Sequence, residues 1–406
     1  MARILVLGAG FAGLWAAIGA ARKLDELQMP RASADILVID RNPYHNIRVR
    51  NYEVDLSEVA LPLARLLDPI GVRHMVADVT AVDPIRQEVI VETERGSERL
   101  GYDRLVLTLG SELVRPAIPG LASHGFDVDT YAAAVRLNDH LTALRRLEAS
   151  PARSTVVVVG AGLTGTEVAT EMPDRLARAG ISDPRVVLLD RNPVGAAMGD
   201  AARPVIEEAL AALRVKTRSQ VEVATVDAKG VTLTSGEFIP TLTVVWCAGM
   251  AASPLTAAMG GERDRHGRLV VNPFMQAAGL KNVFAAGDAA VCKLDGEHPT
   301  VMSCQFARPM GRFAGHNVVA DLYGQPMLPL QIDWYVTVLD LGRWGALYTT
   351  GWDRQVSATG SAAKATKLTI NHERIYPPLN GRPADLFAAA APTIQAPPPL
   401  RAQPRK

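Results

Sequence analysis

Two stretches of the chain are near copies of each other and decide its fold: ILVLGAGFAG at residues 4–13 and VVVVGAGLTG at residues 156–165. Each begins with an apolar run that suits a buried strand and ends in a GxGxxG glycine turn. An alanine-rich helical stretch follows each turn, and then a second apolar run ending in an acid, ILVIDRNP at 36–43 and VVLLDRNP at 186–193. This order predicts a parallel sheet with crossover helices. We therefore predict an α/β fold with two Rossmann-like dinucleotide-binding domains.

The first glycine turn has the residues that dinucleotide binding requires. Gly8 allows the tight turn, Gly10 lets the backbone approach a pyrophosphate, and Gly13 lets the helix pack closely on the sheet. The phosphates would lie at the positive end of that helix. Asp40, at the end of the second strand, would accept hydrogen bonds from the adenosine ribose. A glycine-rich turn that binds nothing is the alternative, but strand, helix and acid all in order favour the dinucleotide.

A Gly-Asp pair late in the chain indicates which nucleotide the first turn binds. NVFAAGDAA (282–290) has the pattern of an apolar strand ending in Gly287-Asp288, and a helix is predicted near 309–323. In a flavoprotein such an aspartate can bind the ribityl hydroxyls, whereas alone it could equally be an ordinary helix N-cap. Together with the N-terminal turn, it favours FAD as the cofactor.

The second glycine turn is predicted to bind NADH. Asp190 ends its second strand, where a carboxylate accepts from both ribose hydroxyls and repels the 2′-phosphate of NADPH. The neighbouring Arg191 could soften that preference, so NADPH is the less favoured alternative. Glu167, two residues beyond the turn, either reaches the nicotinamide or is a solvated helix residue.

Composition and charge exclude several other classes of protein. The 406 residues carry a formal net charge of +1 with no basic stretch, so nucleic acid is not an expected partner. The 3 cysteines have neither CxxC nor CxxxxC spacing, which argues against a disulfide framework, a structural zinc site and a redox cysteine pair. Cys292 and Cys304 flank the predicted flavin, but a small buried side chain is the simpler interpretation of each. Cys247 lies in an apolar strand and is interpreted as structural. We expect no bound metal.

The expected location is the cytoplasm. No apolar run is as long as the roughly 18 residues that a membrane-spanning helix needs. The glycine turn close to the N-terminus argues against a signal peptide.

Together these motifs resemble the type II NADH dehydrogenases (NADH:quinone oxidoreductases), a group of the two-dinucleotide-binding-domain flavoproteins. The resemblance extends over about residues 1–350 and is carried by GAGFAG, VIDRNPYHN, VVVVGAGLTGTEVA and NVFAAGDAA. TLGSE (108–112) and WCAGM (246–250) look like the two crossovers between the domains of this group. The resemblance implies an NAD domain inserted in the FAD domain, plus a small α+β C-terminal region for dimer or membrane contact.

The resemblance also divides the chain into segments. They are an FAD-binding domain in two parts, a connecting segment, an inserted NAD(H)-binding domain and a C-terminal interface region, followed by a tail whose proline-rich composition predicts disorder. The FAD-binding parts are 1–115 and 266–328, and the connecting segment is 116–150. The NAD(H)-binding domain is 151–265, the interface region is 329–385 and the tail is 386–406. Within the interface region, the aromatic and β-branched residues of 333–351 suggest an antiparallel hairpin or small sheet.

The candidate residues come from the two turns and from the resemblance, which implies that Thr108, Gly110 and the backbone near Val79 lie against FAD and that Gly249 lies near NADH. The FAD candidates are Gly8, Gly10, Phe11, Ala12, Gly13, Asp40, Arg41, Val79, Thr108, Leu109, Gly110, Gly287 and Asp288. The NADH candidates are Gly160, Gly162, Leu163, Thr164, Gly165, Asp190 and Gly249, and the catalytic candidates are Gln305 and Glu167.

One stretch departs from the family. Where the family commonly has Ala-Gln-x-Ala-x-Gln along the quinone site, this chain has CQFARP at 304–309. Pro309 replaces the second glutamine and can start a helix at its first position. Gln305 is a candidate for a hydrogen bond to flavin or acceptor, or else a polar residue at a helix start. Residues 361–372 could form a short basic helix on a membrane surface, although a plain surface helix fits better.

The expected reaction passes hydride from NADH to FAD and then two electrons to an acceptor, a quinone by resemblance. A rival interpretation is an NADH-dependent reductase of a ferredoxin-type protein or of a small aromatic biosynthetic substrate. A non-enzymatic one is a flavin-bound protein whose redox state controls partner binding. The resemblance further implies a homodimer, and peripheral contact with the inner face of the membrane is an alternative to a wholly cytoplasmic location.

Overall fold

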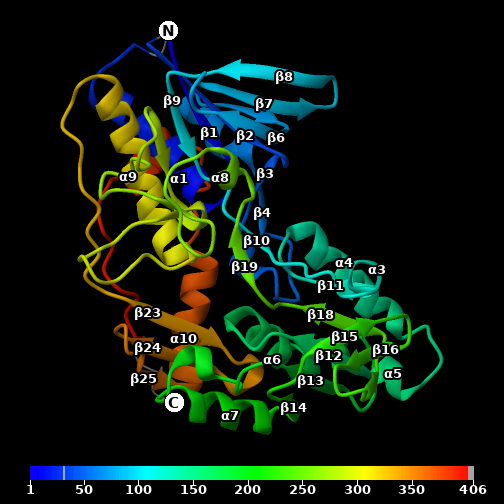
Figure 1. Ribbon diagram of the computed structural model, residues 1–406. Coiled ribbons are helices and arrows are strands. Elements are labelled where there is room, and N and C mark those ends of the chain that lie inside the picture. The colour runs from blue at the N-terminus through cyan, green and yellow to red at the C-terminus, as the bar shows by residue number, and fades with distance from the viewer. Residues whose placement is uncertain (31–32, 401–406) are drawn as a thin grey trace.

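The structure, a computed structural model, describes residues 1–30 and 33–400. Its first sheet is parallel, in the order β21-β9-β1-β2-β5. These strands are β1 (Ala2–Leu7), β2 (Ala34–Asp40), β5 (Arg73–Val76), β9 (Arg104–Leu107) and β21 (Val283–Ala285). Figure 1 labels β9, β1 and β2 of this sheet. Because β21 comes from far along the chain and pairs with β9, this sheet is assembled from two separate segments. The predicted α/β class, with one domain inserted in the other, is confirmed.

The second sheet repeats the architecture of the first, in the order β11-β18-β12-β13-β14, again with every pair parallel. Its strands are β11 (Gly125–Phe126), β12 (Thr155–Val159), β13 (Arg185–Leu189), β14 (Val215–Arg218) and β18 (Thr243–Trp246). Residues 116–150, expected as a connection, supply the edge strand β11 and the helix α4 (Tyr131–Leu144). Leu137 and Leu141 of α4 are buried in the core of this second unit.

The first sheet is covered by two helices in close contact, α1 (Phe11–Glu26) and α9 (Cys304–Leu322). Glycines permit the approach: a Cβ on Gly315 would lie 2.1 Å from the carbonyl oxygen of Ala16.

The helix α9 is the one predicted near 309–323, and it begins five residues earlier than predicted. The prediction that Pro309 occupies its first position is wrong. Pro309 lies inside α9, where its missing N–H leaves the carbonyl of Gln305, four residues before, without its helical bond.

The C-terminal region forms the predicted small antiparallel sheet, β23 (Val336–Asp340), β24 (Ala346–Thr350) and β25 (Gln355–Thr359). The helix expected within 361–372 is α10 (Gly360–Thr369), continued by a π-helical turn, η6 (Ile370–Arg374). One side of α10 packs on β24, with Ala363 fully buried.

The prediction that residues 386–406 are disordered is wrong for 386–400, and residues 401–406 lie outside the described residues. This segment includes the end of the helix α11 (Pro383–Ala389), whose Leu386 is buried with Ala390 in the core of the first unit. The Tyr348 hydroxyl also donates a 2.8 Å hydrogen bond to the carbonyl of Pro398. Apolar residues between the prolines give the segment surface to bury, which a composition-based prediction overlooks.

Several smaller elements complete the described chain, and none of its helices is long and apolar enough to cross a membrane. A three-stranded antiparallel sheet joins β6 (Asp78–Asp83), β7 (Glu88–Thr93) and β8 (Gly96–Gly101). A second such sheet joins β15 (Val223–Val226), β16 (Gly230–Leu233) and β17 (Phe238–Pro240). Two-stranded pairs are β3 (Tyr44–Asn46) with β4 (Ala60–Pro62) and β20 (Leu269–Val270) with β22 (Ala290–Val291). Besides α4, the second unit contains the helices α6 (Leu163–Arg178) and α7 (Arg203–Ala212).

Candidate active site

The first glycine turn, between β1 and α1, has the geometry that its sequence predicts. Gly8 has φ +95°, in the region that favours glycine, and a Cβ there would lie 2.6 Å from the carbonyl oxygen of Thr108. A Cβ on Gly13 would lie 1.8 Å from the Gly8 oxygen, so helix and turn are in backbone contact. Gly10 is different, because a Cβ there would meet nothing within 4 Å. The open space beside Gly10 lies at the N-terminus of α1, where an anionic pyrophosphate fits.

The second turn, between β12 and α6, reproduces this arrangement position by position. Gly160 has φ +103°, a Cβ on Gly165 would lie 1.7 Å from the Gly160 oxygen, and a Cβ on Gly162 would meet nothing within 4 Å. The two turns are therefore equivalent cradles, each with space kept free at its middle glycine.

Asp40, which ends β2, and Asp190, which directly follows β13, also brace the turns, a role that the sequence did not suggest. Asp40 Oδ2 accepts a 2.7 Å hydrogen bond from the Ala9 amide, and Asp190 Oδ2 accepts one of 2.6 Å from the Ala161 amide. Burial raises the pKa of Asp40, while the hydrogen bond from Ala9 opposes that shift. Since a carboxylate has about four acceptor positions, both aspartates retain capacity for ribose hydroxyls.

Asp288 lies at a cavity of about 310 Å³, named here the Asp288 cavity. The one-turn helix η4 (Gly287–Ala289) carries Asp288 inside it and has Ala286 as its N-cap, so the N-cap interpretation of Asp288 is wrong. Its Oδ2 accepts a 2.7 Å hydrogen bond from the Ser111 hydroxyl, and burial raises the pKa of this carboxyl group. The cavity brings together Gly10, Phe11, Ala12, Thr108, Gly110, Gly287, Asp288 and, from the second unit, Thr164.

Other candidates lie outside this cavity. Arg41 is exposed and pairs with Asp78 at 3.0 Å, and Val79 of β6 and Leu109 pack against the first core. Gly249 faces Val114, because a Cβ added to Gly249 would lie 3.0 Å from the Val114 Cβ. Leu163 lines a different cavity, described below.

Sequence reasoning missed Arg48, which connects several groups at the Asp288 cavity. Its Nη1 donates a 3.1 Å hydrogen bond to the Ser111 hydroxyl, and its Nη2 pairs with Asp129. Ser111 itself lies in the TLGSE stretch, so the crossover motif was the one available signal for this cluster.

The two predicted crossovers lie side by side. They form the antiparallel pair β10 (Ser111–Leu113) and β19 (Met250–Ala252), in which Ser111 faces Ala252. The indole N–H of Trp246 donates a 3.0 Å hydrogen bond to the carbonyl of Val114, which ties the ends of the two crossovers together. The two units therefore meet next to the Asp288 cavity.

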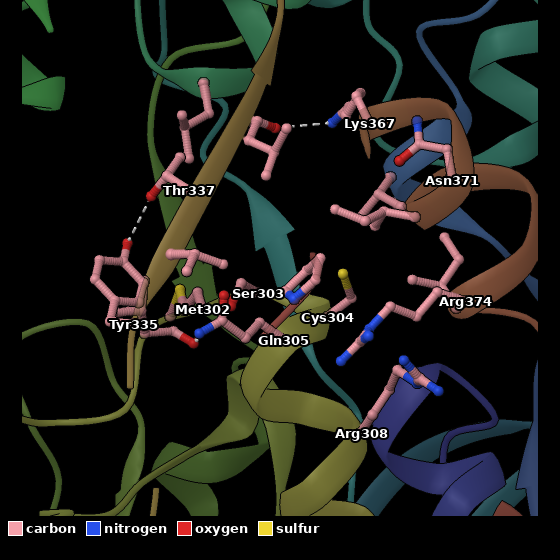
Figure 2. A pocket seen from close by; sticks show the side chains of 18 of the residues that line it. Met302, Ser303, Cys304, Gln305, Arg308, Tyr335, Thr337, Lys367, Asn371 and Arg374 are labelled. Atoms are coloured by element: carbon pink, nitrogen blue, oxygen red, sulfur yellow. Dashed lines mark hydrogen bonds between the residues drawn. The ribbon is translucent and has the colours of Figure 1, made fainter. Parts of the chain in front are cut away.

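A second cavity, of about 290 Å³, shares a wall with the first and is named here the Arg312 cavity. Met302, Ser303 and Cys304 line both cavities. Gln305, at the start of α9, faces the Arg312 cavity, and its buried Nε2 has no hydrogen-bond partner among the described residues. Figure 2 shows Gln305 in this wall with Tyr335 of the C-terminal region nearby.

Glu167 lies in the wall of the Arg312 cavity, in a buried ion pair, so its interpretation as a solvated residue is wrong. Its Oε1 lies 2.7 Å from Lys367 Nζ and accepts a 3.1 Å hydrogen bond from the Asp340 amide. Burial raises the pKa of Glu167, although Lys367 opposes that shift. Burial lowers the pKa of Lys367, but attraction to Glu167 outweighs it and the net shift is upward. Contact with a nicotinamide stays a prediction.

The three cysteines are free thiols, and burial raises the pKa of each. Cys292 is buried with its pKa raised to about 11. Cys247, expected to be purely structural, also lines the Asp288 cavity, while Cys304 lies in the shared wall. All three are therefore protonated at neutral pH. No group of three or more His, Cys, Asp or Glu residues suited to a metal ion occurs in residues 1–30 and 33–400.

Comparison with known proteins agrees with this architecture. Residues 2–311 match the family described as pyridine nucleotide-disulphide oxidoreductase. The chain belongs to that family. An NADH dehydrogenase-like protein of Mycobacterium tuberculosis is 56% identical over 400 residues, covering 97% of this chain and 99% of its own. A demethylphylloquinone reductase of Synechocystis is 30% identical over 355 residues, covering 85% of this chain and 86% of its own.

A solved structure of NDH2 from Plasmodium falciparum superimposes with a TM-score of 0.77 at 13% identity, covering 96% of this chain and 97% of that one. At that identity the match supports the fold alone. The resemblance to the type II NADH dehydrogenase group, predicted from the motifs, is confirmed by the relatives.

Proposed function

We propose that this protein is an FAD-dependent NADH oxidoreductase that reduces a quinone-type small molecule. The observation that carries the proposal is the wall shared by the two cavities at Met302, Ser303 and Cys304. Both cavities therefore reach this wall: the Asp288 cavity, which is lined by Gly10 of the first turn and by Thr164 next to the second, and the Arg312 cavity. The names of the Mycobacterium and Synechocystis relatives support NADH as donor and a quinone as acceptor.

The residues present fit FAD. The free space at Gly10 suits its pyrophosphate, and Asp288, held by Ser111, is available to orient the ribityl hydroxyls. When bound, FAD would supply a two-electron carrier between NADH and the acceptor. The unpartnered Gln305 Nε2 is available to donate a hydrogen bond to the acceptor ring. In the overall reaction NADH gives two electrons and one proton as hydride, solvent gives a second proton, and the quinone becomes a hydroquinone.

The proposal is tested by adding NADH to the purified yellow protein without oxygen. We expect the flavin absorbance to bleach and a soluble naphthoquinone to restore it, with oxidised ferredoxin-type proteins as the comparison acceptors. Bleaching that only an iron–sulfur protein reverses would disprove the quinone-type acceptor. Failure to bleach would disprove the enzyme proposal and favour a flavin-bound interaction protein. A homodimer and contact with a membrane surface stay predictions.

Asp190→Ala should reduce the preference for NADH over NADPH. Asp190 would bind the ribose hydroxyls of NADH, and its charge would repel a 2′-phosphate. Because it also braces Ala161, its removal should weaken both nucleotides, so the ratio of the two kcat/KM values is the informative measurement. We expect this ratio to fall about tenfold or more, the effect of losing one or two hydrogen bonds plus a repulsion.

Asp40→Ala provides the matched control, since it removes the equivalent brace in the first turn. It should reduce FAD retention and leave the NADH to NADPH ratio unchanged in the protein that retains flavin. Equal effects of Asp190→Ala on NADH and NADPH would contradict the assigned role.

A further inference from the structure

Besides Arg48, which is paired with Asp129, three arginines line the Arg312 cavity. Arg308 and Arg312 come from α9, one and two turns beyond Gln305, and Arg374 comes from η6. Figure 2 shows Arg308 and Arg374 reaching toward each other. Within residues 1–30 and 33–400, neither Arg308 nor Arg312 has a hydrogen-bond or ion-pair partner, and Arg374 donates to the carbonyl of Ala396. The cavity thus has a strong local excess of positive charge.

Burial makes this excess costly. Arg308 is 7% exposed and Arg312 is 2% exposed, and the Nε atoms of both, with one terminal nitrogen of Arg312, are buried without a partner. Burial lowers the pKa of Arg308 to about 10, and burial with repulsion from Arg308 and Arg374 lowers that of Arg312 to about 9. All three remain charged at neutral pH. Buried guanidinium groups are ordinarily paired, so the unpaired Arg308 and Arg312 imply an anion other than those of residues 1–30 and 33–400.

The fold holds two of these side chains in place through Trp15 of α1. The Cζ of Arg312 lies 4.6 Å from the centre of the indole ring, and that of Arg308 lies 5.4 Å from it. This cation–π contact stabilises the charges but offers no acceptor for the guanidinium N–H groups. Their hydrogen-bonding capacity is therefore preserved for a ligand.

The obvious internal and cofactor anions do not fill this role. Among residues 1–30 and 33–400, the one acidic residue in the cavity wall is Glu167, which is paired with Lys367. A pyrophosphate at the first glycine turn would lie beside Gly10 in the Asp288 cavity, whose lining includes neither Arg308 nor Arg312. The anion must instead enter the Arg312 cavity itself.

The rest of the cavity indicates the kind of molecule that would carry this anion. Ile332, Tyr335, Val336, Ile370 and Ile375 supply a largely apolar wall. Gln305, Arg308 and Arg312 follow one face of α9, so the two guanidinium groups originate about 5 and 11 Å along the helix axis from Gln305. That separation suits an aromatic ring beside Gln305 with an acidic substituent directed along α9.

We propose that the Arg312 cavity binds an aromatic carboxylate, with its carboxylate held by Arg308, Arg312 and Arg374. The inference rests on the proposed function and narrows it: the acceptor is a quinone-type ring that carries an anionic group. An ordinary quinone with an uncharged side chain would leave the guanidinium groups of Arg308 and Arg312 unpaired.

Binding tests the inference independently of turnover. Titration calorimetry of the FAD-loaded protein would compare 2-naphthoate with 2-naphthamide, which has nearly the same shape and no charge. We expect naphthoate to bind about tenfold tighter or more. Arg312→Met and Arg308→Met should each reduce that preference about tenfold. Arg99→Met, which removes an exposed arginine in β8, is the control for net charge and should retain it.

Turnover separates this inference from the proposed function. A naphthoquinone propanoic acid and its methyl ester share one ring, and we expect kcat/KM to favour the acid about tenfold or more, with the preference lost in Arg312→Met. Equal binding of naphthoate and naphthamide would overturn the inference, even if both quinones are reduced. Preferential binding of naphthoate by a protein that reduces neither quinone would uphold the anion site and disprove the quinone-type acceptor.

Discussion

Gly162→Val should produce a stable yellow protein that NADH no longer bleaches, whereas Gly10→Val should produce a colourless one. Both glycines are N-caps with extended backbone, and a Cβ at either position meets nothing within 4 Å. The fold therefore loses at most about 1 kcal/mol from the poorer N-cap. Each valine would instead occupy the space through which a pyrophosphate approaches the backbone N–H groups. Loss of two such charge-assisted hydrogen bonds lowers kcat/KM for NADH about 100-fold or more in Gly162→Val.

The measurements are the flavin absorbance of each purified variant, its melting temperature and the rate of bleaching by NADH. Dithionite, which needs no nucleotide site, should still reduce the flavin of Gly162→Val at the wild-type rate. Gly101→Val, at the end of β8 where the nearest atom to the added Cβ is 3.9 Å away, is the matched control. A Gly10→Val protein that retains full flavin would contradict FAD binding at the first turn, and normal bleaching of Gly162→Val would contradict NADH binding at the second.

The two cradles could be predicted because every requirement for them is local. Gly8 and Gly13 are needed for contacts within one strand, turn and helix, and the same contacts recur at Gly160 and Gly165, so an internal repeat reveals both. Asp288 was found because a Gly-Asp pair after an apolar strand is also a local signal. The pairing of β10 with β19 was foreseen only through the resemblance, since nothing in either short strand specifies its partner.

The Arg312 cavity could not be predicted, because its parts are distant in sequence. Arg312 reaches its position through the packing of α9 on α1, which places it over Trp15. The polar partner of Glu167 is Lys367, 200 residues away, so Glu167 could not be recognised as a paired residue from its own neighbourhood. The tail was mistaken for disordered chain for a similar reason: its prolines are visible in the sequence, but the surface that buries Leu386 is not.

Lys367→Met should destabilise the protein by about 3–5 kcal/mol, the typical cost of removing one partner of a buried ion pair. The carboxylate of Glu167 would remain buried, with the Asp340 amide as its remaining hydrogen-bond donor. Methionine keeps the length of the side chain, so lost packing contributes little. Urea unfolding at about pH 7.5 measures the loss, and the double variant Glu167→Gln/Lys367→Met should recover most of it because no unpaired charge is then buried.

The pH dependence distinguishes an unpaired carboxylate from lost packing. Burial raises the pKa of Glu167, and removal of Lys367 deletes the charge that opposes this shift. A carboxyl group with a raised pKa in the folded state contributes stability below its unfolded pKa and loses that contribution as the pH rises through its folded pKa. The deficit of Lys367→Met relative to the wild type should therefore be largest near neutrality and shrink toward about pH 5, close to the range where glutamate protonates. The double variant lacks this carboxyl group, so its deficit should change less with pH than that of Lys367→Met, and a pH-independent deficit in Lys367→Met itself would show that the ion pair is not what stabilises this part of the fold.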